Sequence, residues 1–246
     1  MVLGHRGGRG EGWPDENSLA AFARAVAEGA DGVELDVRLT ADGVPVVFHD
    51  PVLARSSPGE VVQSLARVSA ADLPLLAGGE RIPRLVDALA ALRGHLVNVE
   101  IKTDVAALSL LGDVPDRLRL VRAAAAAVKS VGGVEVRFSS FDPLVVMALA
   151  AIAPRVPRAI LVDRSTPRAA TALALGMKPA VIAAHLHESL LTPARAGRLQ
   201  RSGLRLAAWT VNDPARAAAL VALGVTWLIT DCPGLLRSSL RSPVRA

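Results

Sequence analysis

Short apolar runs recur along this chain, and one of them carries acidic residues at alternate positions. From Gly32 to Val37 the order places Glu34 and Asp36 on one face of a strand and leaves the other face apolar. Seven further runs predict strands with the bounds Val2–Arg6, Leu96–Ile101, Val134–Ser139, Arg158–Val162, Ala180–His185, Leu204–Thr210 and Thr226–Thr230.

Helix-like segments separate most of these runs. They are rich in alanine and predict helices at Asn17–Ala27, Leu118–Lys129, Pro143–Ala153, Pro193–Gln200 and Asp213–Leu223. Strands that alternate with helices at this period predict parallel pairing, and eight such units predict a (β/α)8 TIM barrel of the α/β class. No Gly-x-Gly-x-x-Gly turn opens the first helix, so a dinucleotide-binding fold gains no support.

A hairpin is predicted directly after the second strand of the barrel. The polar turn Thr40–Gly43 reverses the chain into a return strand, Val44–Phe48, which brings His49 back toward Glu34 and Asp36. The following segment, Pro51–Arg93, is less regular and is expected above or beside the barrel. Within it we expect a loop at Arg55–Glu60, a short helix near Ser69–Leu73 and a helix near Arg84–Leu92. No linker divides the chain, so residues 1–246 are expected to form a single domain with a frayed end at Arg241–Ala246.

The composition favours one well-buried core without a membrane span. The chain has 246 residues, of which 51% are hydrophobic, and it contains no apolar window of membrane-spanning length. The first strand begins at Val2, which leaves no room for a signal peptide, and the single Cys232 excludes an internal disulfide framework. We therefore expect a cytoplasmic protein. Nothing in the sequence indicates its oligomeric state.

The net charge of +5 does not indicate a specific nucleic-acid partner. A basic surface can bind phosphate backbones, but the arginines are scattered along the predicted helices. The chain has no tyrosine and only four phenylalanines, so it offers few side chains for base stacking.

Three acidic residues are predicted to converge at the carboxyl ends of the strands, where TIM barrels carry their active sites. Glu34 and Asp36 come from the second strand and Glu100 from the third. Close carboxylates repel one another, and a set of oxygen ligands favours a divalent cation, Mg²⁺ or Ca²⁺. The alternative is a salt-bridge cluster with the cations Arg6, Arg38 and Lys102.

Histidines and cations flank this acidic centre. His5 and His49 can act as a general acid and base, and Arg6 and Lys102 can neutralise an anionic group. At two other strand ends, His185 and Trp209 are candidates for contact with the substrate, although either can instead serve the packing. His187 is expected on the surface. The chemistry favoured is metal-assisted cleavage of an anionic ester, of which a phosphodiester fits best.

An ordered series of short motifs resembles the glycerophosphodiester phosphodiesterase family, in its cytoplasmic bacterial form, along nearly the whole chain. The motifs are His5–Gly7, Glu16–Ser18, Gly29–Val37, Asp42–Gly43, Val47–Asp50, Ile82–Pro83, Glu100–Lys102, Ser139–Phe141, Trp209–Asn212 and Thr230–Asp231. The resemblance implies a barrel hydrolase that converts glycerophosphodiesters into glycerol 3-phosphate and an alcohol. It also implies that His5 and His49 are the acid/base pair, that Glu34, Asp36 and Glu100 bind Mg²⁺ or Ca²⁺, and that Arg6 and Lys102 meet the phosphate. The residue matching Glu16 lies near the same site.

Two other functions remain alternatives. A lysophospholipase-D-like or phosphatidylinositol-cleaving barrel would need an apolar rim, and only the loop Ala106–Gly112 offers one. A non-catalytic barrel that binds phosphate or a protein partner would be expected to lack a histidine or a metal-binding carboxylate, and none is missing.

Overall fold

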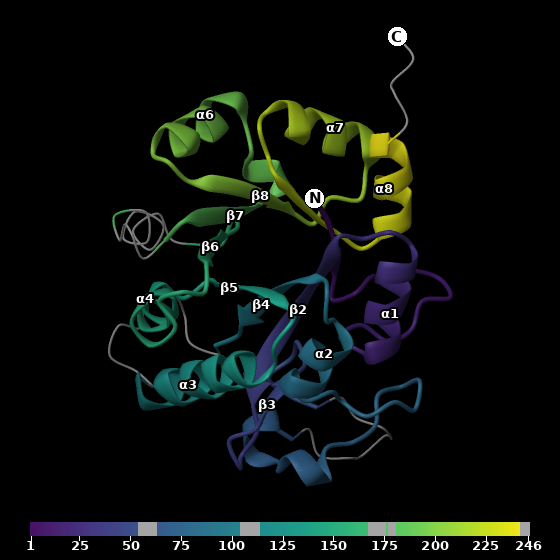
Figure 1. The fold of residues 1–246 in the computed structure, drawn as a ribbon, viewed down its shortest axis with the longest axis vertical. Coiled ribbons are helices and arrows are strands. Elements are labelled where there is room, and N and C mark those ends of the chain that lie inside the picture. The colour runs from purple at the N-terminus through teal and green to yellow at the C-terminus, as the bar shows by residue number, and fades with distance from the viewer. Residues whose placement is uncertain (54–62, 104–113, 167–175, 177–180, 242–246) are drawn as a thin grey trace.

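The computed structural model describes residues 1–53, 63–103, 114–166, 176 and 181–241. Eight parallel strands form a closed barrel in which β1 pairs with both β2 and β9 (Figure 1). The barrel strands are β1 (Val2–His5), β2 (Gly32–Leu39), β4 (Leu96–Ile101), β5 (Glu135–Ser140), β6 (Arg158–Val162), β7 (Ala183–His187), β8 (Arg205–Trp209) and β9 (Trp227–Thr230). The predicted TIM barrel is confirmed.

Helices surround the barrel and bury the outer faces of its strands. They are α1 (Leu19–Ala27), α2 (Leu85–Ala91), α3 (Val114–Ser130), α4 (Pro143–Ile152), α6 (Pro193–Arg201), α7 (Pro214–Ala222) and α8 (Pro233–Arg241). Asp142, Thr192 and Asp213 cap three of these helices, each followed by a proline in the first turn, as is typical of helix starts. Helix α8 was not predicted from the sequence.

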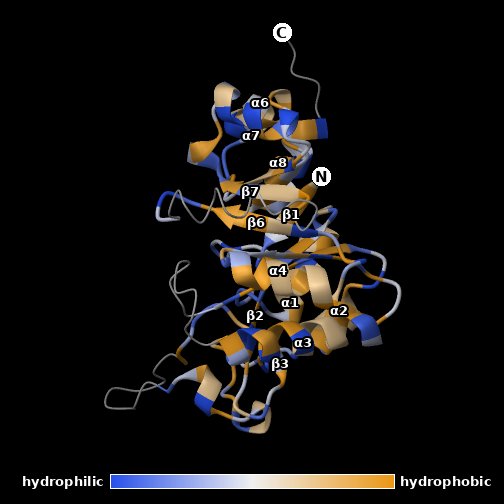
Figure 2. Cartoon of the chain, turned by 90° about the vertical axis from the view of Figure 1, so that its left-hand side faces the viewer, coloured by the Kyte–Doolittle hydropathy of each residue, from blue (hydrophilic) through white to orange (hydrophobic). Residues whose placement is uncertain are grey.

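The alternation in β2 sorts its side chains as the sequence predicts. Val33, Leu35 and Val37 are fully buried in the apolar layer that includes residues of α1, α2 and α3. Glu34 and Asp36 point to the opposite face, inside the barrel. Strand β6 is also buried and mostly hydrophobic, as its orange colour in Figure 2 shows. Because every second residue of β2 is held in this apolar layer, the two carboxylates have a fixed direction.

An extra strand, β3 (Pro45–Val47), lies outside the closed barrel and pairs antiparallel with β2. It packs with a small apolar cluster that includes Leu53, Leu65 and Ile82, at the lower end of the molecule in Figure 1. Two short 3-10 helices, η1 (Leu65–Arg67) and η2 (Ala70–Asp72), belong to this insertion. The predicted hairpin addition is therefore confirmed.

The predicted bounds of one strand were wrong in a way that matters for the site. The expected strand Ala180–His185 is observed as β7, which begins at Ala183 and ends at His187. His185 consequently lies in the middle of the strand and is buried, and the residue at its end is His187. This alanine-rich stretch has no clear alternation of apolar and polar positions from which its bounds can be read.

Some expectations cannot be compared with the structure. The loop Arg55–Glu60, the loop Ala106–Gly112, Ala180 and residues 242–246 lie outside the described residues. Arg241 is the last residue of α8 rather than part of a frayed end. Among the described residues, no helix has both the length and the apolar character needed to cross a lipid bilayer.

Candidate active site

The three predicted carboxylates meet inside the barrel. In the pairing of β2 with β4, Asp36 lies opposite Glu100. Glu34 precedes Asp36 by two residues on β2 and therefore points to the same face. One oxygen from each of Glu34, Asp36 and Glu100 lies within 4.8 Å of the other two, and all three side chains are buried.

Their protonation reflects burial and mutual repulsion. Burial, together with the charges of Asp36 and Glu100, raises the pKa of Glu34 well above its usual value. Burial is also the main cause that raises the pKa of Glu100 to about 7, against the opposing effect of Lys102. For Asp36 the effect of burial is outweighed by the cations Lys102 and Arg6, which lower its pKa.

The carboxylates fit a divalent cation better than they fit a closed set of salt bridges. Lys102 Nζ lies 3.0 Å from Glu100 Oε1 and 3.6 Å from Asp36 Oδ1, and Arg6 Nε lies 3.1 Å from Asp36 Oδ2. Arg38, by contrast, donates its Nε to the carbonyl of His49. Among the described residues, the buried Oε1 of Glu34 has no hydrogen-bond partner. A buried, unpaired carboxylate oxygen in a set of oxygen ligands suits a hard cation.

The raised pKa of Glu100 predicts how pH acts on the metal-free protein. The folded state keeps a proton up to about pH 7, whereas the unfolded chain releases it near the ordinary value of 4.5. The stability that this proton supplies is complete below pH 4.5, the unfolded pKa, and is lost as pH rises through about 7, the folded pKa.

We therefore expect the thermal midpoint of the metal-free protein to fall as pH rises from about 5 to about 7.5. Melting curves with chelator would measure it. Glu100→Gln should flatten the profile, and a midpoint that rose over this window would contradict the assignment.

His5 is held firmly in one orientation. Its Nδ1 lies 2.8 Å from Oδ1 of Asp231, which follows β9, and its Nε2 lies 4.0 Å from Oε2 of Glu34. Asp231 in turn accepts hydrogen bonds from Arg9 and from the side chain of Asn212, and these bonds together with His5 lower its pKa despite burial. The Nε2 of His5 is therefore the nitrogen that faces the carboxylates.

His49 is held at the same site from the other side. Phe48 N donates to Asp36 O at 3.0 Å, which keeps the end of the hairpin against β2. The Nδ1 of His49 lies 2.7 Å from Asp50, but Asp50 is 63% exposed whereas Asp231 is 17% exposed. Burial is the main cause that lowers the pKa of His49, although Asp36 opposes it. Of the two histidines, His5 has the better shielded partner.

The turn after β1 directs two further groups to the site. Arg6 has a φ of 53°, in the left-handed region, and the turn lets its backbone N–H donate to Glu34 Oε2 at 3.0 Å. Its guanidinium spans Asp36 and Glu16, with 2.7 Å from Nη1 to Glu16 Oε1. Asn17, also left-handed, donates its Nδ2 to Asp36 and accepts from the Asp36 N–H. The Asn17 amide thus orients Asp36, a role not predicted from the sequence.

These groups open into one cavity of about 240 Å³ at the carboxyl ends of the strands. It is lined by His5, Arg6, Glu34, His49, Asn98, Glu100, Lys102, Phe141, Leu161, Asp163, Trp209 and Ile229. Trp209 therefore lines this cavity, and Glu16 lines a smaller neighbouring cavity that shares His49. His185 lines neither cavity. Burial lowers its pKa to about 3, and its ring packs 5.8 Å from Trp227.

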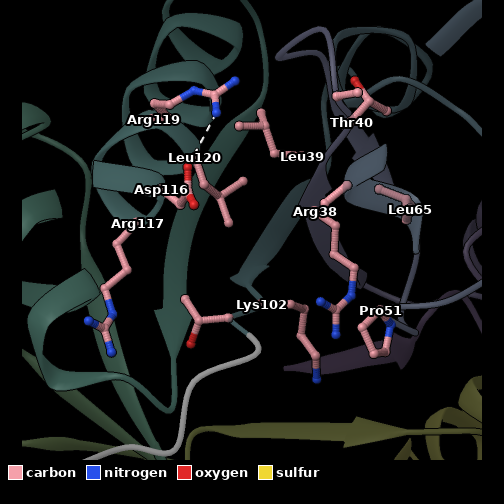
Figure 3. A pocket seen from close by; sticks show the side chains of 13 residues that line it. Arg38, Leu39, Thr40, Pro51, Leu65, Lys102, Asp116, Arg117, Arg119 and Leu120 are labelled. Carbon is pink, nitrogen blue, oxygen red and sulfur yellow. Dashed lines mark hydrogen bonds and ion pairs between the residues drawn. The ribbon is translucent and has the colours of Figure 1, made fainter. Parts of the chain in front are cut away.

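A second cavity, of about 230 Å³, lies between the β2–β3 hairpin and the first turns of α3 (Figure 3). Figure 3 shows Arg38 and Lys102 on one wall, opposite Asp116 and Arg119, which form an ion pair. None of its described lining residues is one of the three carboxylates or a histidine. We therefore place the chemistry in the first cavity, with Lys102 between the two.

The prediction missed several polar residues that the fold brings to the site. Asp231 and Asn212 were noted at strand ends and within motifs but given no role, Asn17 was noted only within a motif, and Arg9 and Asp163 were given no role. For Asp231 and Asp163 a signal existed, because each directly follows a barrel strand. The prediction for His187 was also incomplete, since its ring lies 5.3 Å from that of Trp209 and it is half-buried.

Comparison with known proteins points to one family. The model of the Glycerophosphoryl diester phosphodiesterase family matches residues 5–235. A glycerophosphodiester phosphodiesterase of Caldanaerobacter subterraneus subsp. tengcongensis is 29% identical over 251 residues, which cover 98% of both chains. An Oleispira antarctica phosphodiesterase, solved with the product sn-glycerol-3-phosphate, is 26% identical with a TM-score of 0.83 and covers 98% of this chain and 97% of its own. A glycerophosphodiester phosphodiesterase from Thermotoga maritima is 27% identical with a TM-score of 0.73, at the same coverage of 98% and 97%.

Proposed function

Because the chain belongs to the glycerophosphoryl diester phosphodiesterase family, a class of phosphoric diester hydrolases, we propose that it hydrolyses glycerophosphodiesters to glycerol 3-phosphate and an alcohol. One observation carries the proposal: Glu34, Glu100, two histidines and two cations line a single cavity at the carboxyl ends of the barrel strands, and Asp36 lies beside these two carboxylates. The product bound to the Oleispira antarctica phosphodiesterase supports the same substrate class.

The proposal includes a divalent cation, Mg²⁺ or Ca²⁺, held by Glu34, Asp36 and Glu100. When bound, such a cation polarises a phosphoryl oxygen and neutralises the charge that develops on it. The unpaired oxygen of Glu34 and the raised pKa of Glu100 support this ligand set, since a cation would favour the ionised carboxylates.

The remaining polar groups act on the phosphate and on protons. Arg6 and Lys102 place positive charge beside the anionic phosphodiester. One imidazole accepts the proton of the attacking hydroxyl as the new P–O bond forms. If water attacks, the product is glycerol 3-phosphate directly; if the substrate's glycerol hydroxyl attacks, the product is a cyclic phosphate, which a water then opens to glycerol 3-phosphate. The other imidazole donates a proton to the alcohol oxygen as its bond to phosphorus breaks. For His5 the nitrogen that exchanges this proton is Nε2, because Nδ1 is occupied by Asp231.

The proposal is tested by the release of glycerol 3-phosphate. Purified protein is incubated with glycerophosphocholine, glycerophosphoethanolamine and glycerophosphoglycerol, with Mg²⁺ or Ca²⁺ and with chelator, and an acylated lysophospholipid serves as the contrasting substrate. The cavity of about 240 Å³ favours the deacylated esters. Cleavage of the lysophospholipid alone would instead support the lysophospholipase-D-like alternative, and release insensitive to chelator would contradict the proposed metal.

Asp231 is expected to act as a positioning residue for His5. Asp231→Asn weakens the pairing with Nδ1 and removes the charge that stabilises an imidazolium. We expect kcat to fall by about two orders of magnitude, the lower end of what a positioned acid–base group supplies, with KM nearly unchanged. Steady-state kinetics would measure this split.

A matched variant is available in Asp50→Asn, which changes the exposed carboxylate beside His49. Solvent can replace much of what this carboxylate supplies, so we expect a smaller loss of kcat than for Asp231→Asn. A larger effect at Asp50 would show that His49, rather than His5, depends on its carboxylate partner.

A further inference from the structure

The catalytic cavity has two chemically different halves. The groups proposed for phosphate cleavage come from β1, β2, the β3 hairpin and the end of β4. The opposite half comes from later strands and is formed by Phe141, Leu161, Trp209 and Ile229, with Asp163 as its one titratable side chain among the described residues. If the phosphate binds at the charged half, as the proposed function requires, this second half is available to one end of the substrate.

Two aromatic rings give the second half a fixed wall. The rings of Phe141 and Trp209 lie 5.6 Å apart at 83°, in an edge-to-face arrangement. Trp209 is held further by its Nε1–H, which donates to the carbonyl of His185 at 3.2 Å, and by the ring of His187. Such rings attract a cation through their faces, and the attraction grows when the cation leaves water.

Asp163 places a negative charge in the same half. Its Oδ1 accepts from the backbone N–H and the hydroxyl of both Ser165 and Thr166, at 2.7–2.8 Å. These four bonds outweigh burial and lower the pKa of Asp163, so the carboxylate is ionised near neutral pH. In the described part of the chain, Oδ2 has no hydrogen-bond partner and no cationic side chain pairs with Asp163.

Among the described residues, the cation that lies over this wall, Lys102, belongs to the charged half. Lys102 Nζ lies 6.0 Å from the centre of the Phe141 ring, but Glu100 at 3.0 Å and Asp36 at 3.6 Å hold it on the acidic side. Asp163 and the aromatic wall are therefore left for the substrate. An ammonium group fits both features, because it can pair with the half-buried carboxylate of Asp163 and lie against the rings, whereas an uncharged or anionic group offers Asp163 no opposite charge.

We infer that Asp163, Phe141 and Trp209 form a subsite for the leaving alcohol that selects head groups carrying a positive charge, namely quaternary or primary ammonium alcohols. The inference rests on the proposed function and makes it more specific. Asp163 and the two rings act on kcat/KM through binding of the head group and take no part in proton transfer.

The test compares a cationic substrate with its uncharged analogue. The substrates are glycerophosphocholine, its neutral analogue in which carbon replaces the quaternary nitrogen, and glycerophosphoglycerol. We expect the wild type to prefer glycerophosphocholine over the neutral analogue by about tenfold in kcat/KM. Asp163→Asn, which keeps the size and most hydrogen bonds of the side chain, should remove most of this preference by lowering kcat/KM for glycerophosphocholine more than kcat/KM for the neutral analogue. Phe141→Leu should reduce the preference independently.

Control measurements distinguish a charge-selective subsite from a general loss of activity. Asp87→Asn, a change of an exposed aspartate on α2, should leave the substrate ratio unchanged. Choline should inhibit the wild type competitively and Asp163→Asn more weakly. Equal kcat/KM of the wild type for glycerophosphocholine and its neutral analogue would overturn the inference and leave the proposed function intact. An equal loss on all three substrates in Asp163→Asn would do the same. Absence of hydrolysis of every glycerophosphodiester would overturn both.

Discussion

Replacement of His49 by alanine is expected to lower kcat for glycerol 3-phosphate release by about a thousandfold, within the range supplied by a positioned acid–base group. His49 lines the same cavity as His5, and burial lowers its pKa, which keeps the imidazole able to accept a proton near neutral pH. The phosphate is held by other groups, Arg6 and Lys102, so KM should change little. Steady-state kinetics on glycerophosphocholine at saturating metal would measure both constants.

A second histidine provides the matched control for this experiment. His95 lies just before β4, at the opposite end of the barrel from the cavity, so His95→Ala should leave kcat within about twofold of the wild type. Full activity in His49→Ala would exclude the two-histidine mechanism. Equal losses in both variants would point to a general effect on folding instead.

Replacement of Glu34 by glutamine is expected to abolish the response to metal and nearly all activity, while it stabilises the metal-free protein. Burial and the charges of Asp36 and Glu100 raise the pKa of Glu34, so its ionised form is unfavourable in the folded state without a cation. Glutamine keeps an acceptor for the Arg6 N–H, which now bonds to Glu34 Oε2. We expect the thermal midpoint without metal to rise by about 2–4 °C, as for a change near 1 kcal/mol in a chain of this size.

Thermal melts with and without Mg²⁺ or Ca²⁺ would measure both effects. The midpoint of the wild type should rise with metal because the cation binds only the folded state, and that of Glu34→Gln should not. Glu135→Gln, an exposed glutamate at the start of β5, is the control for loss of one acidic charge. A metal-induced shift of wild-type size in Glu34→Gln would remove Glu34 from the proposed ligand set.

The barrel was predictable wherever alternation was strong. In β2 the acidic and apolar residues alternate strictly, and the hairpin that follows has a clear polar turn, so both strands and their directions were correct. In β7 alanine occupies positions of both kinds, and the predicted bounds missed the end of the strand by two residues. Because of that error, His185 was predicted at the rim of the site, whereas it is buried in the middle of β7.

The site was predictable in its charged half because those residues share strands or neighbouring strands. Their partners were harder to find, since the contact between His5 and Asp231 joins residues 226 positions apart and depends on how the barrel closes. The partners of Asp163 are local in the sequence, because Ser165 and Thr166, which donate hydrogen bonds to its carboxylate, follow it by two and three positions within the same turn. A local turn signal was present there, but nothing in the sequence indicates that the turn faces the catalytic cavity.

The pairing of β1 with β9 also bears on how the protein is made. His5 precedes the carboxylate that orients it by 226 positions, and that carboxylate, Asp231, follows the barrel strand β9. A nascent chain without β9 would leave β1 and β8 as open sheet edges, which are prone to pairing with other chains. The contact between His5 and Asp231 therefore forms only when β9 has docked against β1, so the proposed activity would report closure of the barrel.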